Sequence, residues 1–375
     1  MPCDWGNLSI HCTSKIAACE CAVPKASIAT SALPVYATDP VATAFIYAGP
    51  AMLFLMTLLV YPLYRMLPMW TRSFRLPRSL TADLSTAAVA TWVALCGVST
   101  AVLIVLSLLL PADVWGDCAH RGVCVYHMMF CEATRHHSPV RHPANFWSNL
   151  PYLYLGIGML CEGVDARVRN SPRPHQLLDA TFALVLLSMC LASFGWHGSN
   201  CTAVHFVDIG LMNCVIAFYP YRFVASSLVA KLHGAGARRR RHTLAVAGGF
   251  VAIVASQLVW ASGQTDQFHE AFPTGHSRFL SLRPVEITIY IGAPGLYPLP
   301  ALLRMAQRRT WGCVPALALS VLGLPIGFLF HAAERVVVDV YCHPTSLLSQ
   351  PTACFHVFTA VAIAGAYVQS HAIEE

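Results

Sequence analysis

Long apolar segments recur along this chain of 375 residues, and they restrict its fold more than any motif does. A helix needs about 20 apolar residues to cross the hydrocarbon core of a bilayer. Nine segments approach that length: roughly 41–64, 84–110, 146–162, 176–196, 203–221, 243–262, 285–303, 313–330 and 352–370. Charged residues make up only 11% of the chain, whereas a soluble domain is about one quarter charged. The sequence therefore predicts an all-α integral membrane protein with nine spans.

Basic residues predict the orientation of these spans. With an outside amino terminus, the four predicted cytosolic loops hold most of the 24 Lys and Arg residues. The positive-inside rule then places the amino terminus outside and the carboxyl terminus in the cytosol. The four arginines at 238–241 fit a topology anchor, with recognition of nucleic acid or acidic lipid as the alternative. We predict contact with the lipid bilayer and no nucleic-acid partner.

Cysteine placement agrees with this orientation, because outside segments are lumenal or extracellular and disulfides persist there. The Cys19-x-Cys21 pair is a disulfide candidate, with metal binding as the alternative.

The predicted organisation is a Cys-containing outside tail (1–40), a two-helix transmembrane extension (41–112), an outside loop rich in His and Cys (113–145), a seven-helix core (146–371) and a cytosolic tail (372–375).

Polar residues are predicted to meet at the outer ends of three helices. Ser193 and His197 lie one turn apart at the end of the fourth span, and Asp208 lies in the first turns of the fifth. Thr352 and His356 lie one turn apart at the start of the last span. Ionisable groups are costly in a membrane, so they mark candidate functional sites. A lone histidine in an apolar helix is more often a structural hydrogen-bonding residue. Two imidazoles and a carboxylate at one depth instead suit a zinc site with an open water position.

Three blocks of this sequence, in order, resemble the alkaline ceramidase-like membrane hydrolases of the CREST superfamily. The first block is FCEATR at 130–135 followed by PANFWSNL at 143–150. The second is Ser193-x-x-x-His197 with Asp208, and the third is CHPTSLL at 342–348 leading to ACFH at 353–356. The resemblance covers roughly residues 130–371. It implies a CREST-like bundle of seven transmembrane helices, preceded here by two extra transmembrane helices.

The resemblance also implies roles for the candidate residues. His197 and His356 are expected to bind zinc, Asp208 to hold or deprotonate the zinc-bound water, and Ser193 to support the site or hydrogen-bond the oxyanion. The expected reaction is hydrolysis of a lipid amide, in ceramide or a related N-acyl lipid, by attack of zinc-bound water. The expected location is the endoplasmic reticulum or Golgi membrane.

One departure from the family pattern lies in the last helix, where the family has His-x-x-x-His and this chain has Thr352 at the first position. A threonine hydroxyl is a poor zinc ligand beside imidazole, carboxylate or thiolate. Either a nearby group such as His343, His205 or Cys354 replaces the missing ligand, or zinc binding is weak or lost. Two alternatives therefore stay open. One is a catalytically impaired relative acting as a lipid-binding or receptor-like protein, and the other is a hydrolase of an ester-linked or GPI-type lipid.

A second departure lies in the segment before the core, where some alkaline ceramidases have oxygen ligands that suit calcium. Only Glu132 matches, while Thr134 and Asn145 stand where more anionic or amide ligands are expected, so no calcium is predicted. Cys131 and Cys342 occupy positions like those of the family's disulfide. The histidines of this segment, at 136, 137 and 142, either sense acid pH or bind a transition metal, or they belong to a solvated polar loop. The sequence does not indicate an oligomeric state.

Overall fold

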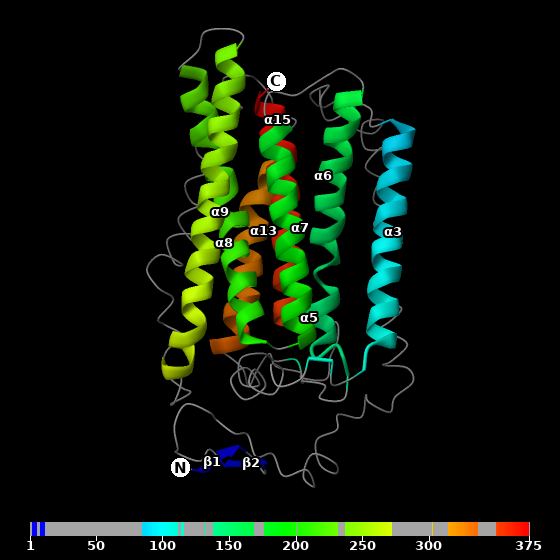
Figure 1. Cartoon of the computed structure of the whole chain (residues 1–375), viewed down its shortest axis with the longest axis vertical. Coiled ribbons are helices and arrows are strands. Elements are labelled where there is room, and N and C mark those ends of the chain that lie inside the picture. Colours follow the sequence, from blue (N-terminus) through cyan, green and yellow to red (C-terminus); the bar gives the residue numbers. More distant parts are fainter. Residues whose placement is uncertain are drawn as a thin grey trace.

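The computed structural model of the chain describes residues 2–5, 8–11, 85–111, 114–115, 132, 138–168, 176–199, 201–231, 237–271, 302, 314–336 and 350–374. Seven long helices run side by side along one axis (Figure 1). They are α3 (Thr86–Leu109), α6 (Leu150–Val168), α7 (Gln176–Ser199), α8 (Thr202–Lys231), α9 (Ala237–Ala271), α13 (Val314–Val336) and α15 (Pro351–Glu374). A short helix, α5 (Pro143–Trp147), precedes α6.

Five of these helices contain segments long and apolar enough to cross a membrane. The segments are Thr86–Leu109, Gln176–Ser199, Val204–Arg222, Thr243–Ala261 and Pro351–His371. The chain is therefore an integral membrane protein with several apolar helices, as the composition predicted. Helices α6 and α13 coincide with two further predicted spans. The predicted span at 41–64 and nearly all of the one at 285–303 lie outside the described residues.

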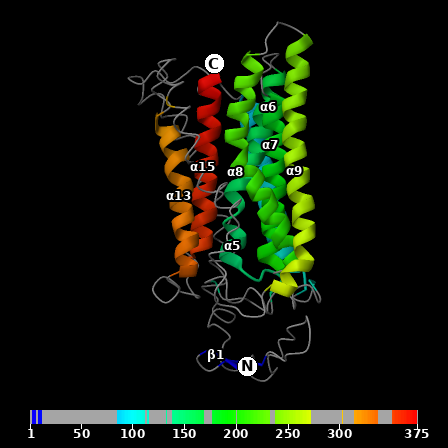
Figure 2. The same cartoon turned by 90° about the vertical axis from the view of Figure 1, so that its left-hand side faces the viewer.

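Helix α7 occupies the middle of the bundle. It packs against α6 on one side and α8 on the other, and α9 lies against α8. Helix α15 pairs with α13 and also contacts α5 and α6 (Figure 2). The apolar part of α7 is 56% buried, whereas the apolar parts of α3 and α9 are each only 17% buried. Helices α3 and α9 are therefore much less buried than α7, as expected for helices at the periphery of the bundle (Figure 1).

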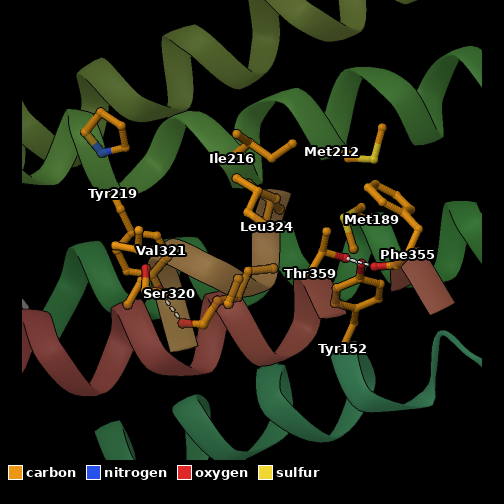
Figure 3. A pocket seen from close by; sticks show the side chains of 15 residues that line it. Tyr152, Met189, Met212, Ile216, Tyr219, Ser320, Val321, Leu324, Phe355 and Thr359 are labelled. Atoms are coloured by element: carbon orange, nitrogen blue, oxygen red, sulfur yellow. Dashed lines mark hydrogen bonds between the residues drawn. The ribbon is translucent and has the colours of Figure 1, made fainter. Parts of the chain in front are cut away.

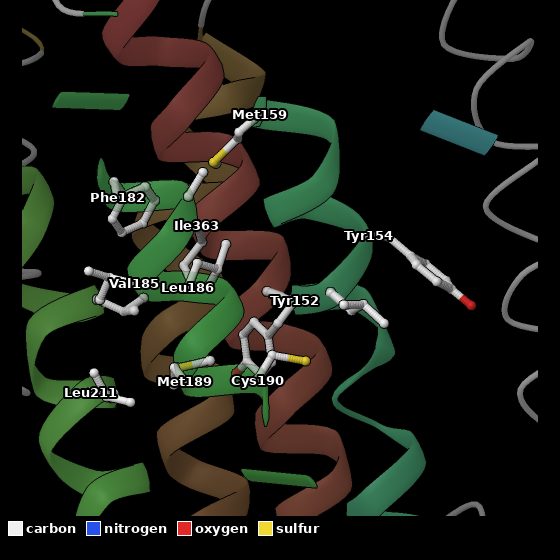
Figure 4. Close-up of a cluster of buried hydrophobic side chains, with 14 of the residues drawn as sticks. Tyr152, Tyr154, Met159, Phe182, Val185, Leu186, Met189, Cys190, Leu211 and Ile363 are labelled. Carbon is white, nitrogen blue, oxygen red and sulfur yellow. The ribbon is translucent and has the colours of Figure 1, made fainter. Parts of the chain in front are cut away.

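The core lies where α6, α7, α8 and α15 meet (Figure 4). Phe182 of α7 is fully buried and stacks on Phe218 of α8, with ring centres 3.9 Å apart. Leu186 and Cys190 continue the same face of α7 and are also fully buried. Because lipid chains are as apolar as these side chains, close packing rather than the hydrophobic effect holds such helices together.

Glycines bring α13 and α15 into backbone contact. A Cβ atom at Gly365 would lie 2.5 Å from the carbonyl oxygen of Ala316, and one at Gly323 would lie 2.8 Å from the carbonyl oxygen of Phe358. Neither distance leaves room for a side chain. Small residues at helix interfaces commonly allow such close approach in membranes.

The amino-terminal tail contains a hairpin that the sequence did not predict. Strands β1 (Pro2–Trp5) and β2 (Leu8–His11) pair antiparallel, with Pro2 opposite His11 and Trp5 opposite Leu8.

Candidate functional site

The carboxyl end of α7, the amino end of α15 and the short helix α5 lie at one end of the bundle, which we term the site end (Figure 1). His197 is in the last turn of α7 and His356 is in the second turn of α15. Their ring centres are 5.2 Å apart, and their exposed fractions are 2% and 6%. The structure thus places the two histidines side by side in a buried environment.

Ser193 and Asp208 form a second pair on neighbouring helices. Ser193 lies one turn before His197 on α7 and is 2% exposed, while Asp208 is half-buried on α8. The Ser193 hydroxyl interacts with the Asp208 carboxylate. Ser193 and Asp208 lie toward the same end of their helices as the histidine pair.

The ring of His356 is oriented by a residue from outside its own helix. Ser148 Oγ lies 2.8 Å from Nδ1 of His356, and the same hydroxyl contacts the carbonyl oxygen of Asn145. Because Nδ1 is engaged in this way, Nε2 is the nitrogen that remains for a metal or a substrate. Ser148 stands in the first block of the family resemblance, but its contact with His356 was not predicted.

Other histidines surround this pair. His142 is fully buried with its ring centre 6.2 Å from that of His197, so the interpretation of a solvated loop is wrong for His142. The backbone explains this burial, because the N–H of His142 donates to the carbonyl oxygen of His197 at 2.9 Å. His331 of α13 interacts electrostatically with His197, and its ring packs against Phe355. His331 was not predicted. It directly follows an apolar segment of the sequence, and a histidine in that place is a signal of a candidate site residue.

The histidine pair fits two positions of a zinc site. Two imidazoles that bind one zinc tetrahedrally through nitrogens at about 2.1 Å have ring centres about 5 Å apart. The observed 5.2 Å between His197 and His356 agrees with that geometry. Among the described residues, however, no group of three or more His, Cys, Asp or Glu side chains is arranged to hold a metal.

Thr352, which stands where the family resemblance implies a further zinc ligand, is 2% exposed. His205, one of the predicted substitutes, packs its ring on Trp196 with ring centres 4.4 Å apart. His343, the second substitute, lies outside the described residues. Cys354, the third, is half-buried in the first turn of α15 and is not disulfide-bonded. Within the ranges that the structure describes, the donor set of a zinc site with three protein ligands is thus incomplete.

Glu132 accepts hydrogen bonds from the backbone of α5. Its two carboxylate oxygens accept hydrogen bonds from the N–H groups of Ala144 and Asn145, at 2.6 Å and 2.9 Å. Amide groups in the first turn of a helix lack partners within the helix, and a carboxylate commonly satisfies them. Thr134, Cys131 and Cys342 lie outside the described residues, so the predicted disulfide does too.

Buried polar groups near the histidines are available to a ligand. Both side-chain amide atoms of Asn145, which is fully buried, have no hydrogen-bond partner among the described residues. The same holds for the indole nitrogen of Trp147. Buried polar groups without partners cost free energy, so sites that bind polar ligands commonly supply them.

An apolar pocket lies between α6, α7, α8, α13 and α15 (Figure 3). Tyr152 and Phe355 line it, and their ring centres are 6.1 Å and 5.8 Å from that of His356. Along α15 the lining residues recur on one face: Phe355, Thr359, Ala362, Ile363 and Ala366. At 1.5 Å per residue this face runs for roughly 16 Å. The pocket has an empty volume of about 610 Å³, counting the part open to the exterior.

The fold defines a class of protein, namely an integral membrane protein with several apolar helices and a buried polar site at one end. No protein-family model, no curated protein and no solved structure matches the chain.

Proposed function

We propose that this chain is a membrane-embedded hydrolase of lipid amides that acts on ceramide or a related N-acyl lipid. The observation that carries the proposal is the buried pair of His197 and His356, with ring centres 5.2 Å apart, beside an apolar pocket. The resemblance of residues 130–371 to the alkaline ceramidase-like hydrolases supports the same reaction.

In this proposal each polar residue has a distinct task. His197 and His356 would hold zinc, which when bound would supply an acidified water and polarise a carbonyl group. Ser148 keeps the ring of His356 in the orientation that leaves Nε2 for the metal. Asp208 accepts a proton from the attacking water, and the Ser193 hydroxyl holds the carboxylate in place.

The pocket supports a lipid as the substrate. Its lining is apolar apart from a few hydroxyl groups (Figure 3), and two of the lining residues, Tyr152 and Phe355, are neighbours of His356. An acyl chain in this pocket would leave the amide near His356. The available polar groups of Asn145 and Trp147 then suit the polar head of such a lipid.

The site end faces the lumen in this proposal, with the carboxyl terminus in the cytosol. Cys201, which directly precedes α8 at the site end, is disulfide-bonded, and disulfides persist in oxidising compartments. This disulfide and the distribution of basic residues both support a lumenal site in the endoplasmic reticulum or Golgi membrane. Spans at 41–64 and 285–303 complete the proposed total of nine.

The proposal is tested with the purified chain and a fluorescent N-acyl sphingoid substrate in detergent micelles. We expect hydrolysis by the wild type, loss of hydrolysis in His197→Ala, and wild-type rates in Ser188→Ala. Ser188 is a suitable control because it is exposed on the same helix and bonds only the carbonyl of Leu184. Equal rates in His197→Ala and the wild type would refute the proposal.

A second candidate function is favoured by Thr352. With a buried hydroxyl at the position of the third ligand, the chain would be an impaired relative that binds lipid without cleaving it. The pocket would then hold the lipid as a ligand rather than as a substrate. Lipid that copurifies with a wild type lacking both zinc and hydrolytic activity would favour this candidate.

A further inference from the structure

Helix α3 lies outside the region of family resemblance, yet hydrogen bonds tie it to α6 at two depths. Far from the site end, the backbone N–H and the hydroxyl of Ser85 donate to the carboxylate of Asp165, at 3.2 Å and 2.7 Å. Farther along, the indole N–H of Trp92 donates to the carbonyl oxygen of Tyr154 at 2.8 Å. The Tyr154 hydroxyl is directed away from the core cluster (Figure 4) and lies 2.8 Å from the hydroxyl of Thr100. These contacts fix the register of α3 against α6.

A further contact is made at the site end, just beyond α3. The indole N–H of Trp115 donates to the carbonyl oxygen of Pro139 at 2.7 Å. Its ring lies over Gly198, where a Cβ atom would be 3.5 Å from Cζ2 of Trp115 and 3.5 Å from Cε2 of Phe146. Trp115 therefore touches both the segment 138–142 and the end of α7.

The segment 138–142 brings His142 to His197. The N–H of Arg141 donates to the carbonyl oxygen of Gly198 at 3.1 Å, and the N–H of His142 donates to that of His197 at 2.9 Å. These two bonds dock the segment on the last turn of α7. The indole of Trp115 covers this junction from the side of the added helix.

We propose that Trp115, in the segment that follows α3, braces the site. Trp115 is a positioning residue: it keeps segment 138–142 docked on α7 and so keeps His142 beside His197. The segment that follows the added helix is then a part of the site end. The effect on local structure stands by itself, whereas the effect on catalysis rests on the proposed function.

Two matched substitutions test the brace. Trp115→Phe keeps an aromatic ring but removes the N–H that reaches Pro139. Trp92→Phe removes the same kind of bond from the added helix itself, at Tyr154, away from the histidines. Both variants are made in the full chain, and hydrogen exchange is followed on peptides that cover residues 138–145.

We expect the amides of Arg141 and His142 to exchange about fivefold faster in Trp115→Phe, the change that corresponds to one hydrogen bond of average strength. In Trp92→Phe their exchange stays at the wild-type rate. Equal exchange in Trp115→Phe and the wild type would overturn the proposal. Faster exchange throughout the chain, including peptides of α13 and α15, would overturn it as well, because the effect would then be general destabilisation.

Kinetics separate this proposal from the proposed function. Where the wild type hydrolyses lipid amides, Trp115→Phe should lower kcat severalfold with little change in KM, and Trp92→Phe should change neither. A wild type without hydrolytic activity but with the expected exchange pattern would refute the proposed function and leave the brace intact. An active wild type with unchanged exchange in Trp115→Phe would refute the brace alone.

Discussion

The Oγ atom of Ser148 lies 2.8 Å from Nδ1 of His356, a contact between residues 208 positions apart in the sequence. Ser148 follows α5 directly and its hydroxyl also contacts the carbonyl oxygen of Asn145. The short helix α5 therefore sets the orientation of a ring on α15. Partners that orient a metal-binding histidine typically change metal affinity or activity by about 10–100-fold when they are removed.

Ser148→Ala is expected to weaken zinc binding by roughly 10–100-fold, because the ring of His356 loses the partner that orients it. Zinc titration of the purified apoprotein measures this affinity, with Ser188→Ala as the control. An affinity in Ser148→Ala equal to that of the wild type would show that the contact does not orient a metal ligand.

Asp208→Asn is expected to lower kcat for lipid-amide hydrolysis by about 10²–10⁴-fold, the usual contribution of a positioned general base. Ser193→Ala should have a smaller effect, because it removes only the hydroxyl that holds the carboxylate. Steady-state kinetics on one N-acyl lipid compare the two variants. An Asp208→Asn variant with wild-type kcat would remove Asp208 from the mechanism.

The close contact of α13 and α15 gives a prediction on stability. Gly365→Ala places a Cβ atom 2.5 Å from the carbonyl oxygen of Ala316, whereas nothing lies within 4 Å of a Cβ at Gly248 on α9. We expect Gly365→Ala to destabilise the fold by about 1–3 kcal/mol, the typical cost of overpacking. Gly248→Ala should be neutral or stabilising, because alanine favours a helix over glycine by about 1 kcal/mol. Thermal unfolding in detergent distinguishes the two, and equal Tm values for both variants would contradict the packing described.

A buried ion pair at the other end of the bundle gives a further prediction. Arg222 of α8 pairs with Asp179 of α7, and Nε2 of His371 lies 3.4 Å from the same carboxylate. Arg222→Met leaves Asp179 buried without its guanidinium, so we expect a loss of about 3–5 kcal/mol. The double variant Arg222→Met, Asp179→Leu should recover most of that loss. Unfolding by denaturant measures both variants, and a double variant as unstable as Arg222→Met would contradict this account.

Composition and apolar length predicted the helices well, because the thickness of a bilayer fixes the length of a span. The predicted spans 84–110 and 176–196 became α3 (Thr86–Leu109) and α7 (Gln176–Ser199). The ends of α8 and α9 were predicted poorly. Helix α9 begins at Ala237 and contains the four arginines, since a helix can continue into water beyond the hydrocarbon core.

The sequence predicted which site residues lie at the same depth in the membrane, but it did not predict how they pack against one another. His197 and His356 were expected at one level because both stand at helix ends, and the structure places their rings together. The contacts of His142 and His331 depend on how helices and loops pack around that level. Spacing along the sequence does not reveal such packing, so these two residues were misjudged or missed.

The most direct test of the account is the zinc content of the purified wild type, His197→Ala and Thr352→His, measured beside their rates of lipid-amide hydrolysis. The account predicts about one zinc per chain in the wild type, its loss together with hydrolysis in His197→Ala, and tighter zinc binding in Thr352→His, where a third imidazole joins the pair. A wild type without zinc and without hydrolysis would contradict the account. Zinc that appears only in Thr352→His would then identify Thr352 as the residue that separates this chain from an active hydrolase.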